Sequence, residues 1–258
     1  MTTSEDAANG SHPVAGEQVQ HDTGVNSNRA FPTSNYADHL DPFVLFERFC
    51  IDPDVGFPMH PHKGFEIVSY LLDGGMAHED SLGVANTAYA GEVMRITTGS
   101  GIRHSEFPAA SAACNGLQLW VNLPRERKSV DADYEDASAE ELPTRTVNGG
   151  TVTTVVGEGS PITLHTDVEY LDATVDSSWT WTVPEGWSGF CYGVDGSGTV
   201  ADDTFSEGDV YPVTDATAEG DDESDREIKV TSDSGLRVVA VVGRPHGEAI
   251  RQRGPFVF

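Results

Sequence analysis

Short apolar segments separated by glycine- and proline-containing turns make up most of this chain. Many of the segments are rich in β-branched and aromatic residues, and they include 43–51 (FVLFERFCI), 67–72 (IVSYLL), 117–123 (LQLWVNL), 179–183 (WTWTV) and 236–242 (LRVVAVV). Runs of this length and composition, bounded by turn residues, predict β-strands. Many short strands of this kind predict a β-sandwich or a β-barrel.

Two stretches depart from this pattern. Residues 1–30 are polar and show no periodicity, which predicts a disordered tail. The acidic stretch 129–142 separates two strand-rich halves, and the spacing of Ser138 and Glu141 fits a capping box on a short helix. We therefore expect an all-β protein with little helix, built from two tandem β-barrels. The expected domains are residues 31–135 and residues 140–258.

Charge is the most unusual property of the composition. The 258 residues include 42 acidic and 15 basic side chains, a net charge of −27, and only Lys63, Lys128 and Lys229 are lysines. The composition fits either a very acidic surface or adaptation to molar salt, where the Debye length falls to about 3 Å. Either way, such a surface is expected to repel nucleic acid and anionic lipid at ordinary salt.

The sequence also carries signals about location. The start, MTTSEDAANG, lacks the basic and apolar regions of a signal peptide, and the aliphatic run 238–242 is far shorter than the roughly 20 residues that span a bilayer. The three cysteines form no CxxC pair, which is typical of reduced thiols. We expect a cytoplasmic protein with no membrane association.

Two pairs of candidate metal ligands lie about forty residues apart. His60 and His62 are two residues apart, and so are His104 and Glu106. In an extended segment, residues i and i+2 point to the same face, so two neighbouring strands would present three nitrogens and one oxygen to one barrel interior. That set suits iron(II), manganese, nickel, copper or zinc and leaves positions open for other ligands. The alternative is two histidine-containing pairs that are exposed by chance.

Several segments resemble the pirin family in its order and spacing. They are DPFVLFERF, GFPMHPHKGFEIVSYLLDG, HEDSLG, GSGIRHSE, GLQLWVNLP and the closing GRPHGEAIRQRGPFVF. Because pirins are cupins, the resemblance implies two tandem jelly-roll cupin domains. It also implies iron as the first choice of metal, with His60, His62, His104 and Glu106 as its ligands. The second half contains no HxH or HxE pair, so its domain is expected to be free of metal.

The resemblance implies two different classes of function. Members of the family are known as quercetin (flavonol) 2,3-dioxygenases, and this activity implies a flavonol-like enol substrate with Glu106 as general base. Other members are redox-sensitive partners of transcription factors or metabolic enzymes, so a protein partner is the alternative. A metal-bound barrel with no turnover is a third reading, and the residues alone do not choose among them.

Residues close to the motifs are interpreted more plainly. Glu66 is expected to lie behind the metal ligands rather than among them. His78 and Asp80 in HEDSLG are expected to stabilise a turn. The aromatic residues Phe57, Phe65 and Trp120 could line the site, although barrel-core packing is the commoner role of such residues.

Overall fold

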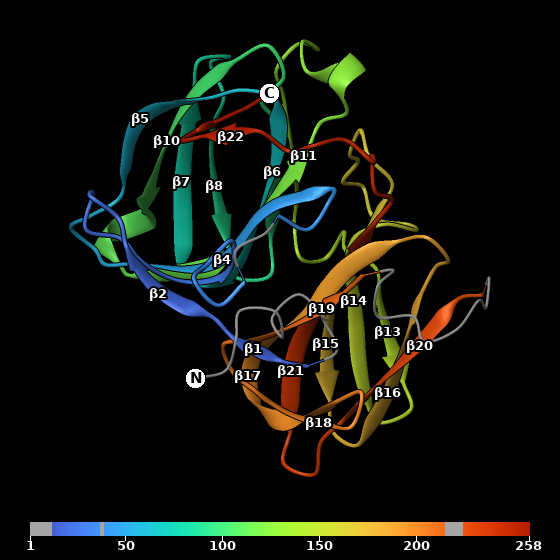
Figure 1. The fold of residues 1–258 in the computed structure, drawn as a ribbon. Coiled ribbons are helices and arrows are strands. Elements are labelled where there is room, and N and C mark those ends of the chain that lie inside the picture. The colour runs from blue at the N-terminus through green and yellow to red at the C-terminus, as the bar shows by residue number, and fades with distance from the viewer. Residues whose placement is uncertain (1–11, 37–38, 215–223) are drawn as a thin grey trace.

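The computed structural model describes residues 12–36, 39–214 and 224–258, and within these it consists almost entirely of β-strands. Figure 1 shows two β-barrels, one built mainly from the first half of the chain and the other mainly from the second half. The described helices are the short 3-10 turns η2 (Ala109–Ser111) and η3 (Arg125–Arg127), and neither has the length or apolar character needed to cross a membrane. The prediction of an all-β protein with two barrels and little helix is confirmed.

The N-terminal barrel contains two antiparallel sheets. One has the strand order β12-β9-β6-β11-β4-β3-β2 and the other has the order β5-β10-β7-β8. The strands are β2 (Glu17–Gln20), β3 (Asn26–Phe31), β4 (Phe43–Ile51), β5 (Phe57–His62), β6 (Phe65–Asp73), β7 (Gly75–Asp80), β8 (Ala85–Tyr89), β9 (Val93–Thr97), β10 (Ile102–Pro108), β11 (Cys114–Asn122) and β12 (Asp133–Ala137).

The C-terminal barrel is built around the path β1-β19-β17-β21-β15-β14-β13, with β16, β18 and β20 attached to it. Its strands are β1 (Val14–Ala15), β13 (Thr144–Val147), β14 (Gly150–Val156), β15 (Val168–Val175), β16 (Ser178–Val183), β17 (Ser188–Val200), β18 (Asp203–Ser206), β19 (Asp209–Val213), β20 (Arg226–Thr231) and β21 (Leu236–Gly243).

The central strands of the seven-stranded sheet are buried on both faces. On β6, Phe65 and Ile67 belong to the apolar cluster inside the N-terminal barrel, whereas Val68 and Tyr70 belong to the cluster that reaches the C-terminal barrel. Alternate side chains of a strand point to opposite faces, so one strand serves both clusters. This double burial explains why β6 reads as a nearly continuous apolar run and not as an apolar-polar alternation.

Aromatic side chains join the two barrels into one core. The ring of Phe190 on β17 lies 5.0 Å from Phe31, 5.7 Å from Phe43 and 4.7 Å from Phe46, measured between ring centroids. All four side chains are buried. Aromatic pairs at these separations add to the free energy gained by burying their area, so the contact between the barrels is a hydrophobic core and not a loose domain boundary.

The ends of the chain cross between the barrels, and the described part of the predicted disordered tail forms strands. Residues 1–11 of the predicted tail lie outside the described residues, but 14–30 contain β1, β2 and most of β3, and β1 pairs with β19 of the other barrel. These segments are too polar to show an apolar periodicity, since edge strands are held largely by backbone hydrogen bonds. At the other end, β22 (Gln252–Arg253) and β23 (Phe256–Val257) pack on the N-terminal barrel.

The acidic stretch between the halves also differs from its prediction. The Glu141 carboxylate accepts the Ser138 backbone N–H at 2.9 Å, which is one of the two bonds of a capping box, and it also accepts the Ser138 hydroxyl at 2.8 Å. The second bond of a capping box is replaced, because the Glu141 backbone N–H donates to the Ser138 carbonyl oxygen. These contacts close a turn and no helix follows, because the chain enters β13 at Thr144. The capping residues were recognised, but the structure that they stabilise is shorter than expected.

Candidate metal centre

Three histidines converge at one end of the N-terminal barrel. Strand β10 pairs with β5 so that His104 lies opposite His60, and Ile102 lies opposite His62. The ring centroids of His60 lie 4.7 Å from His62 and 4.5 Å from His104. One ring nitrogen from each of the three histidines lies within 4.8 Å of the others. The predicted pairing of the two motifs across neighbouring strands therefore forms in the structure.

Backbone carbonyls orient two of these rings. The Nδ1 atom of His60 lies 2.8 Å from the Pro58 carbonyl oxygen, and Nδ1 of His62 lies 3.3 Å from the Pro255 carbonyl oxygen. A carbonyl at Nδ1 selects the tautomer that carries its proton there, which leaves the Nε2 lone pair free for a cation. The Nε2 atoms of His60 and His104 are 3.1 Å apart. Two imidazole nitrogens aimed at each other at this distance suit a shared proton or a shared ion.

The histidines are neutral at neutral pH. Burial, together with the neighbouring His60 and against the bond to Pro255, lowers the pKa of His62 to about 3. Burial, together with the charges of the other site histidines, holds the pKa of His104 well below its ordinary value. Burial also lowers the pKa of His60. Neutral imidazole is the form that binds metal, so the site needs no deprotonation step to accept an ion.

Glu106 lies in the same cavity but in a different state. Its side chain is buried, and among the described residues its Oε1 atom has no hydrogen-bond partner. Burial raises the pKa of this carboxyl to about 7, the Gln118 side chain lowers it, and the charge of Glu47 raises it. A buried carboxyl without a full set of partners is costly, and a cation beside it would offset that cost. The group of ligand atoms that lie within 4.8 Å of one another contains the three histidines and not Glu106, which lines the cavity beside them. Three neutral imidazoles with a carboxyl group nearby suit a first-row metal.

A cavity of about 310 Å³ opens beside these residues. His60, His62 and Glu106 form part of its wall, while Leu45, Phe57, Trp120, Gln252 and Gly254 line other parts. The Trp120 ring stands edge-on to His62 at 5.1 Å, and Phe65 stacks on Trp120 at 4.3 Å. Trp120 therefore lines the cavity, whereas Phe65 supports it from the barrel core.

A polar group that the sequence did not reveal also lines the cavity. Arg29 donates from Nε and Nη2 to the Glu47 carboxylate at 2.9 and 2.8 Å, and His21 Nε2 lies 3.3 Å from Glu47. Burial raises the pKa of Glu47, but the bond to His21 and the charge of Arg29 outweigh burial, so the pKa stays below its ordinary value. A charged residue within the apolar run FVLFERF was the signal that could have identified this group.

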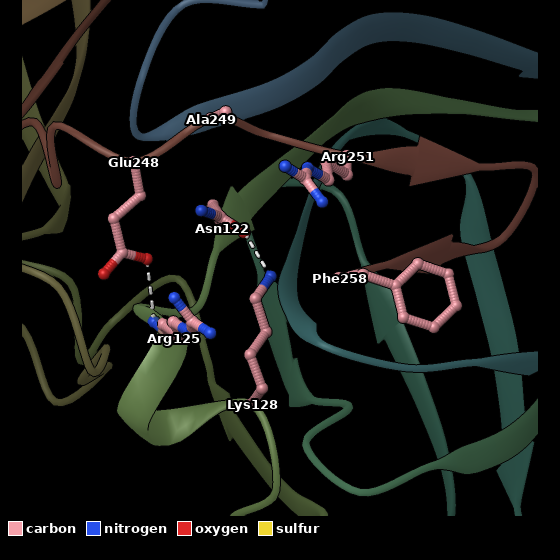
Figure 2. A pocket seen from close by; sticks show the side chains of 7 residues that line it. All are labelled: Asn122, Arg125, Lys128, Glu248, Ala249, Arg251 and Phe258. Atoms are coloured by element: carbon pink, nitrogen blue, oxygen red, sulfur yellow. Dashed lines mark hydrogen bonds between the residues drawn. The ribbon is translucent and has the colours of Figure 1, made fainter.

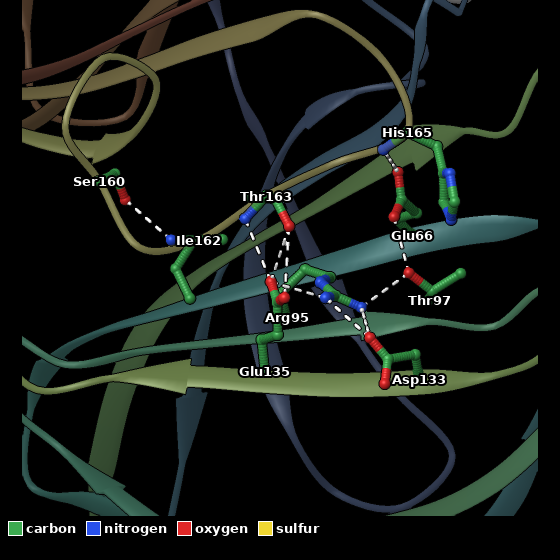
Figure 3. A network of polar contacts seen from close by, with 9 residues as sticks. All are labelled: Glu66, Arg95, Thr97, Asp133, Glu135, Ser160, Ile162, Thr163 and His165. Carbon is green, nitrogen blue, oxygen red and sulfur yellow. Dashed lines mark hydrogen bonds and ion pairs between the residues drawn. The ribbon is translucent and has the colours of Figure 1, made fainter.

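Glu66 is not among the clustered ligands, as expected, but its hydrogen bonds go to other residues than those ligands. Its Oε1 accepts from the Thr97 hydroxyl at 2.7 Å, and its Oε2 accepts from the His165 backbone N–H at 2.9 Å. Figure 3 shows these contacts as part of a network around Arg95, which also pairs with Glu135 at 2.6 Å. Glu66 and His165 thus connect the two halves of the chain, and the described contacts of the Glu66 side chain do not reach the metal ligands.

His78 and Asp80 have the structural role that was expected of them. Asp80 accepts hydrogen bonds from the backbone N–H groups of Leu82 and Val84 at 2.8 and 3.1 Å, which closes the turn after β7. His78 Nε2 lies 3.1 Å from Asp80 Oδ2, and the His78 ring lies 5.4 Å from the ring of His104. The pair therefore also packs beside the deepest histidine of the site.

Tandem β-barrels, with a histidine cluster inside one of them, define a bicupin with a candidate metal site. Sequence profiles support this class: the Pirin profile matches residues 24–121, and the profile of the Pirin C-terminal cupin domain matches residues 170–258. Pirin-1 of Arabidopsis thaliana is 40% identical over 236 residues, covering 84% of this chain and 77% of that protein. The chain belongs to the pirin family.

Two further relatives bear on function. A Pseudomonas aeruginosa protein, provisionally named a quercetin 2,3-dioxygenase, is 35% identical over 237 residues, which cover 85% of this chain and 81% of that protein. The crystal structure of the bacterial pirin YhhW from Escherichia coli, in complex with nickel(II), has the same fold at a TM-score of 0.70. It is 24% identical, and the alignment covers 89% of this chain and 95% of that chain.

Proposed function

We propose that this protein is a metal-dependent dioxygenase that acts on flavonol-like enols. The observation that carries the proposal is a cluster of three neutral imidazoles, two of which line a cavity together with the buried Glu106 carboxyl group and apolar aromatic side chains. A small-molecule site of this kind combines a mostly apolar lining with a few polar groups, and a volume of about 310 Å³ lies in the range of such sites. The Pseudomonas relative supports the choice of substrate class.

The metal would be held by His60, His62, His104 and Glu106. Iron is the first choice, and manganese, nickel, copper or zinc also suit this donor set. The nickel complex of YhhW supports metal binding on this fold without selecting the metal. When bound, the metal would lower the pKa of a substrate hydroxyl and supply the open positions that oxygen chemistry needs.

Glu106 would act as the general base. Its Oε1 has no protein partner among the described residues, and its pKa is raised to about 7 by burial, so it can gain or lose a proton near neutral pH. We assign to it the proton of the enol hydroxyl, which it would accept on a carboxylate oxygen. The three histidines, which are neutral and two of which are fixed by backbone carbonyls, would hold their positions and transfer no proton.

The remaining cavity walls would orient the substrate. Leu45, Phe57 and Trp120 offer apolar surface for aromatic rings and exclude water. On the polar side, Glu47 is held ionised by Arg29, so its oxygens can accept hydrogen bonds from substrate hydroxyl groups. The two carboxyl groups of the cavity would therefore have separate tasks, because their environments move their pKa values in opposite directions.

The test is oxygen consumption and loss of flavonol absorbance at high salt, expressed per bound metal. Iron-loaded protein should exceed free iron, and Glu106→Gln should lower the rate about 100-fold or more. Glu79→Gln is the matched control, because Glu79 is an exposed glutamate on the neighbouring strand β7. A rate no better than that of free iron would refute the catalytic proposal. Full metal content and full rate in Glu106→Gln would refute the role of Glu106.

A further inference from the structure

A second cavity, of about 420 Å³, lies beside the C-terminal segment, which we define as residues 248–258. Its lining combines side chains of that segment with side chains around η3, and Figure 2 shows them all: Asn122, Arg125, Lys128, Glu248, Ala249, Arg251 and Phe258. None of these residues belongs to the lining of the metal cavity. The two cavities are therefore separate sites.

This cavity is positively charged in a strongly acidic protein. Three of the 15 basic residues of the chain line it, whereas Glu248 is the one acidic side chain in the lining. With Lys128 protonated, the lining has three positively charged side chains and one negatively charged side chain, a surplus of basic side chains. In a molecule of net charge −27, such a concentration of positive charge attracts anions locally and against the overall field.

The two arginines have donors to spare. Within residues 12–36, 39–214 and 224–258, the guanidinium groups of Arg125 and Arg251 make no hydrogen bond or ion pair. Glu248 does not neutralise Arg125 through the guanidinium, because its carboxylate accepts the Arg125 backbone N–H at 2.9 Å. By contrast, Arg237 is bound by the Asp172 carboxylate at 2.6 and 3.0 Å.

Lys128 is held in place at the back of the cavity. Its ammonium group donates to the Gly64 carbonyl oxygen at 2.8 Å and to the Asn122 side-chain oxygen. An ammonium group has three N–H donors, so one remains for a ligand. Burial lowers the pKa of Lys128 to about 8, although the charge of Glu248 raises it. An anion in the cavity would stabilise the charged form.

We propose that this cavity binds a small dianion, either a phosphate group or a pair of carboxylates, between Arg125, Lys128 and Arg251. Guanidinium groups donate in planar forks that match both phosphate and carboxylate oxygens, and such charge-assisted bonds are among the stronger hydrogen bonds in proteins. The negative charge of the ligand is complementary to the surplus of basic side chains in the lining. The donor geometry and the charge of this cavity do not depend on the proposed oxygenase reaction.

The C-terminal segment also connects this cavity to the metal cavity. Gln252 and Gly254 of the segment line the metal cavity, and the Pro255 carbonyl is the partner of His62 Nδ1. Arg251 of the same segment lines the anion cavity. Its backbone carbonyl oxygen accepts a hydrogen bond from the Phe258 backbone N–H at 3.0 Å. A dianion bound by Arg251 would therefore stabilise the segment that covers the metal cavity.

The test is isothermal titration of the metal-loaded protein with inorganic phosphate and, separately, with malonate. The potassium chloride concentration is the lowest at which the protein stays folded. We expect binding of one anion per chain, and Arg125→Gln and Arg251→Gln should each weaken it about tenfold or more. The anion that binds more tightly identifies the ligand as a phosphate or a dicarboxylate.

The chain offers a matched control for each variant. Arg127 lies in the same 3-10 turn as Arg125, and Arg253 lies two residues after Arg251, but neither lines the cavity. Arg127→Gln and Arg253→Gln remove the same charge, so they should leave the affinity within about twofold. Equal weakening by all four variants would show diffuse attraction and overturn the proposal. So would the failure of both anions to bind to the wild-type protein at about 10 mM.

Discussion

The two barrels of this protein share an architecture but fill their interiors differently. The C-terminal barrel is packed with apolar side chains, among them Trp179, Trp181, Phe205 and Val238. The N-terminal barrel instead places His104 and Glu106 on inward-facing positions of β10, with His60 and His62 beside them. The same scaffold thus yields a solid core in one half and a polar cavity in the other.

The difference shows what each half contributes. Buried polar groups cost free energy unless they find partners, so the N-terminal barrel carries a local penalty at its site. The C-terminal barrel covers the outer face of the seven-stranded sheet and supplies the segment that carries Pro255 to His62. It therefore supports the site mechanically, even though the ligand candidates all come from the other barrel.

The largest effect is expected from removing two histidines of the polar cavity, which tests whether metal binding belongs to the N-terminal barrel. His60→Ala/His62→Ala should abolish metal binding, because half of the proposed donor set is gone. His165→Ala, an exposed histidine in the C-terminal half, is the control and should keep the metal content of the wild type. Elemental analysis of the purified proteins decides the matter. Full occupancy in the double variant would place the metal elsewhere.

The shared core between the barrels can be tested by a cavity mutation. Phe190→Ala should lower the free energy of unfolding by about 3–5 kcal/mol, since the ring is fully buried among three other aromatic rings. Tyr89→Ala removes a ring that is 54% exposed, and it should change stability by less than about 0.5 kcal/mol. Urea unfolding followed by tryptophan fluorescence measures both. A loss below about 1 kcal/mol for Phe190→Ala would show that the barrels fold independently.

The Arg29–Glu47 pair in the lining of the metal cavity predicts a pH dependence of stability. Glu47→Gln should cost about 2 kcal/mol at pH 7, because it removes the charge that Arg29 binds. The folded pKa of Glu47 is lowered, so its stabilisation is present above the unfolded value of about 4.3 and is lost as pH falls through the folded pKa. The difference in the free energy of unfolding between wild type and Glu47→Gln should therefore become smaller below about pH 4.

The control for this prediction is an exposed ion pair. Glu207 pairs with Arg48 at 2.7 Å, but its side chain is 57% exposed. Glu207→Gln should change the free energy of unfolding by less than about 1 kcal/mol at any pH, as is usual for surface pairs. Chemical unfolding between pH 3 and 8 measures all three proteins. A difference for Glu47→Gln that increases as pH falls would contradict the assigned ionisation.

The sequence predicted the chemistry of the site better than its surroundings. The i, i+2 spacing placed the two residues of each pair on one face of an extended segment, and the resemblance to the pirin family implied that the two pairs meet. The pairing of β5 with β10 brings His60, His62 and His104 together. The Arg29–Glu47 pair depends on β3 and β4 pairing, which the sequence does not encode locally. The contacts of Glu66 were not predicted for the same reason, because its partner His165 is 99 residues away.

The fold shows a similar limit. The apolar runs identified most strands, because burial enforces their composition. Strands β1 to β3 were missed, since their backbone hydrogen bonds tolerate polar residues such as those of Glu17–Gln20. The sequence also did not predict that the C-terminal segment returns to the first barrel. That return depends on contacts between residues far apart in the sequence, such as the hydrogen bond from the Val257 backbone N–H to the Lys63 carbonyl oxygen.

The smallest expected effect is a difference between the two barrels in how salt changes their stability, because their net charges differ. Residues 31–135 contain 15 acidic and 7 basic side chains, a net charge of −8, whereas residues 140–258 contain 22 acidic and 7 basic side chains, a net charge of −15. Raising potassium chloride from 0.1 M to molar concentrations shortens the Debye length from about 10 Å to about 3 Å, which screens repulsion among carboxylates. The melting temperature should therefore rise by several degrees.

Hydrogen exchange should slow more in the strands of the C-terminal barrel than in those of the N-terminal barrel, because local opening there relieves more repulsion. Sucrose at equal osmolality is the control, since it stabilises compact states without screening charge. A flat or falling melting temperature would contradict adaptation to high salt, and equal gains in the two barrels would show that local net charge does not control the response.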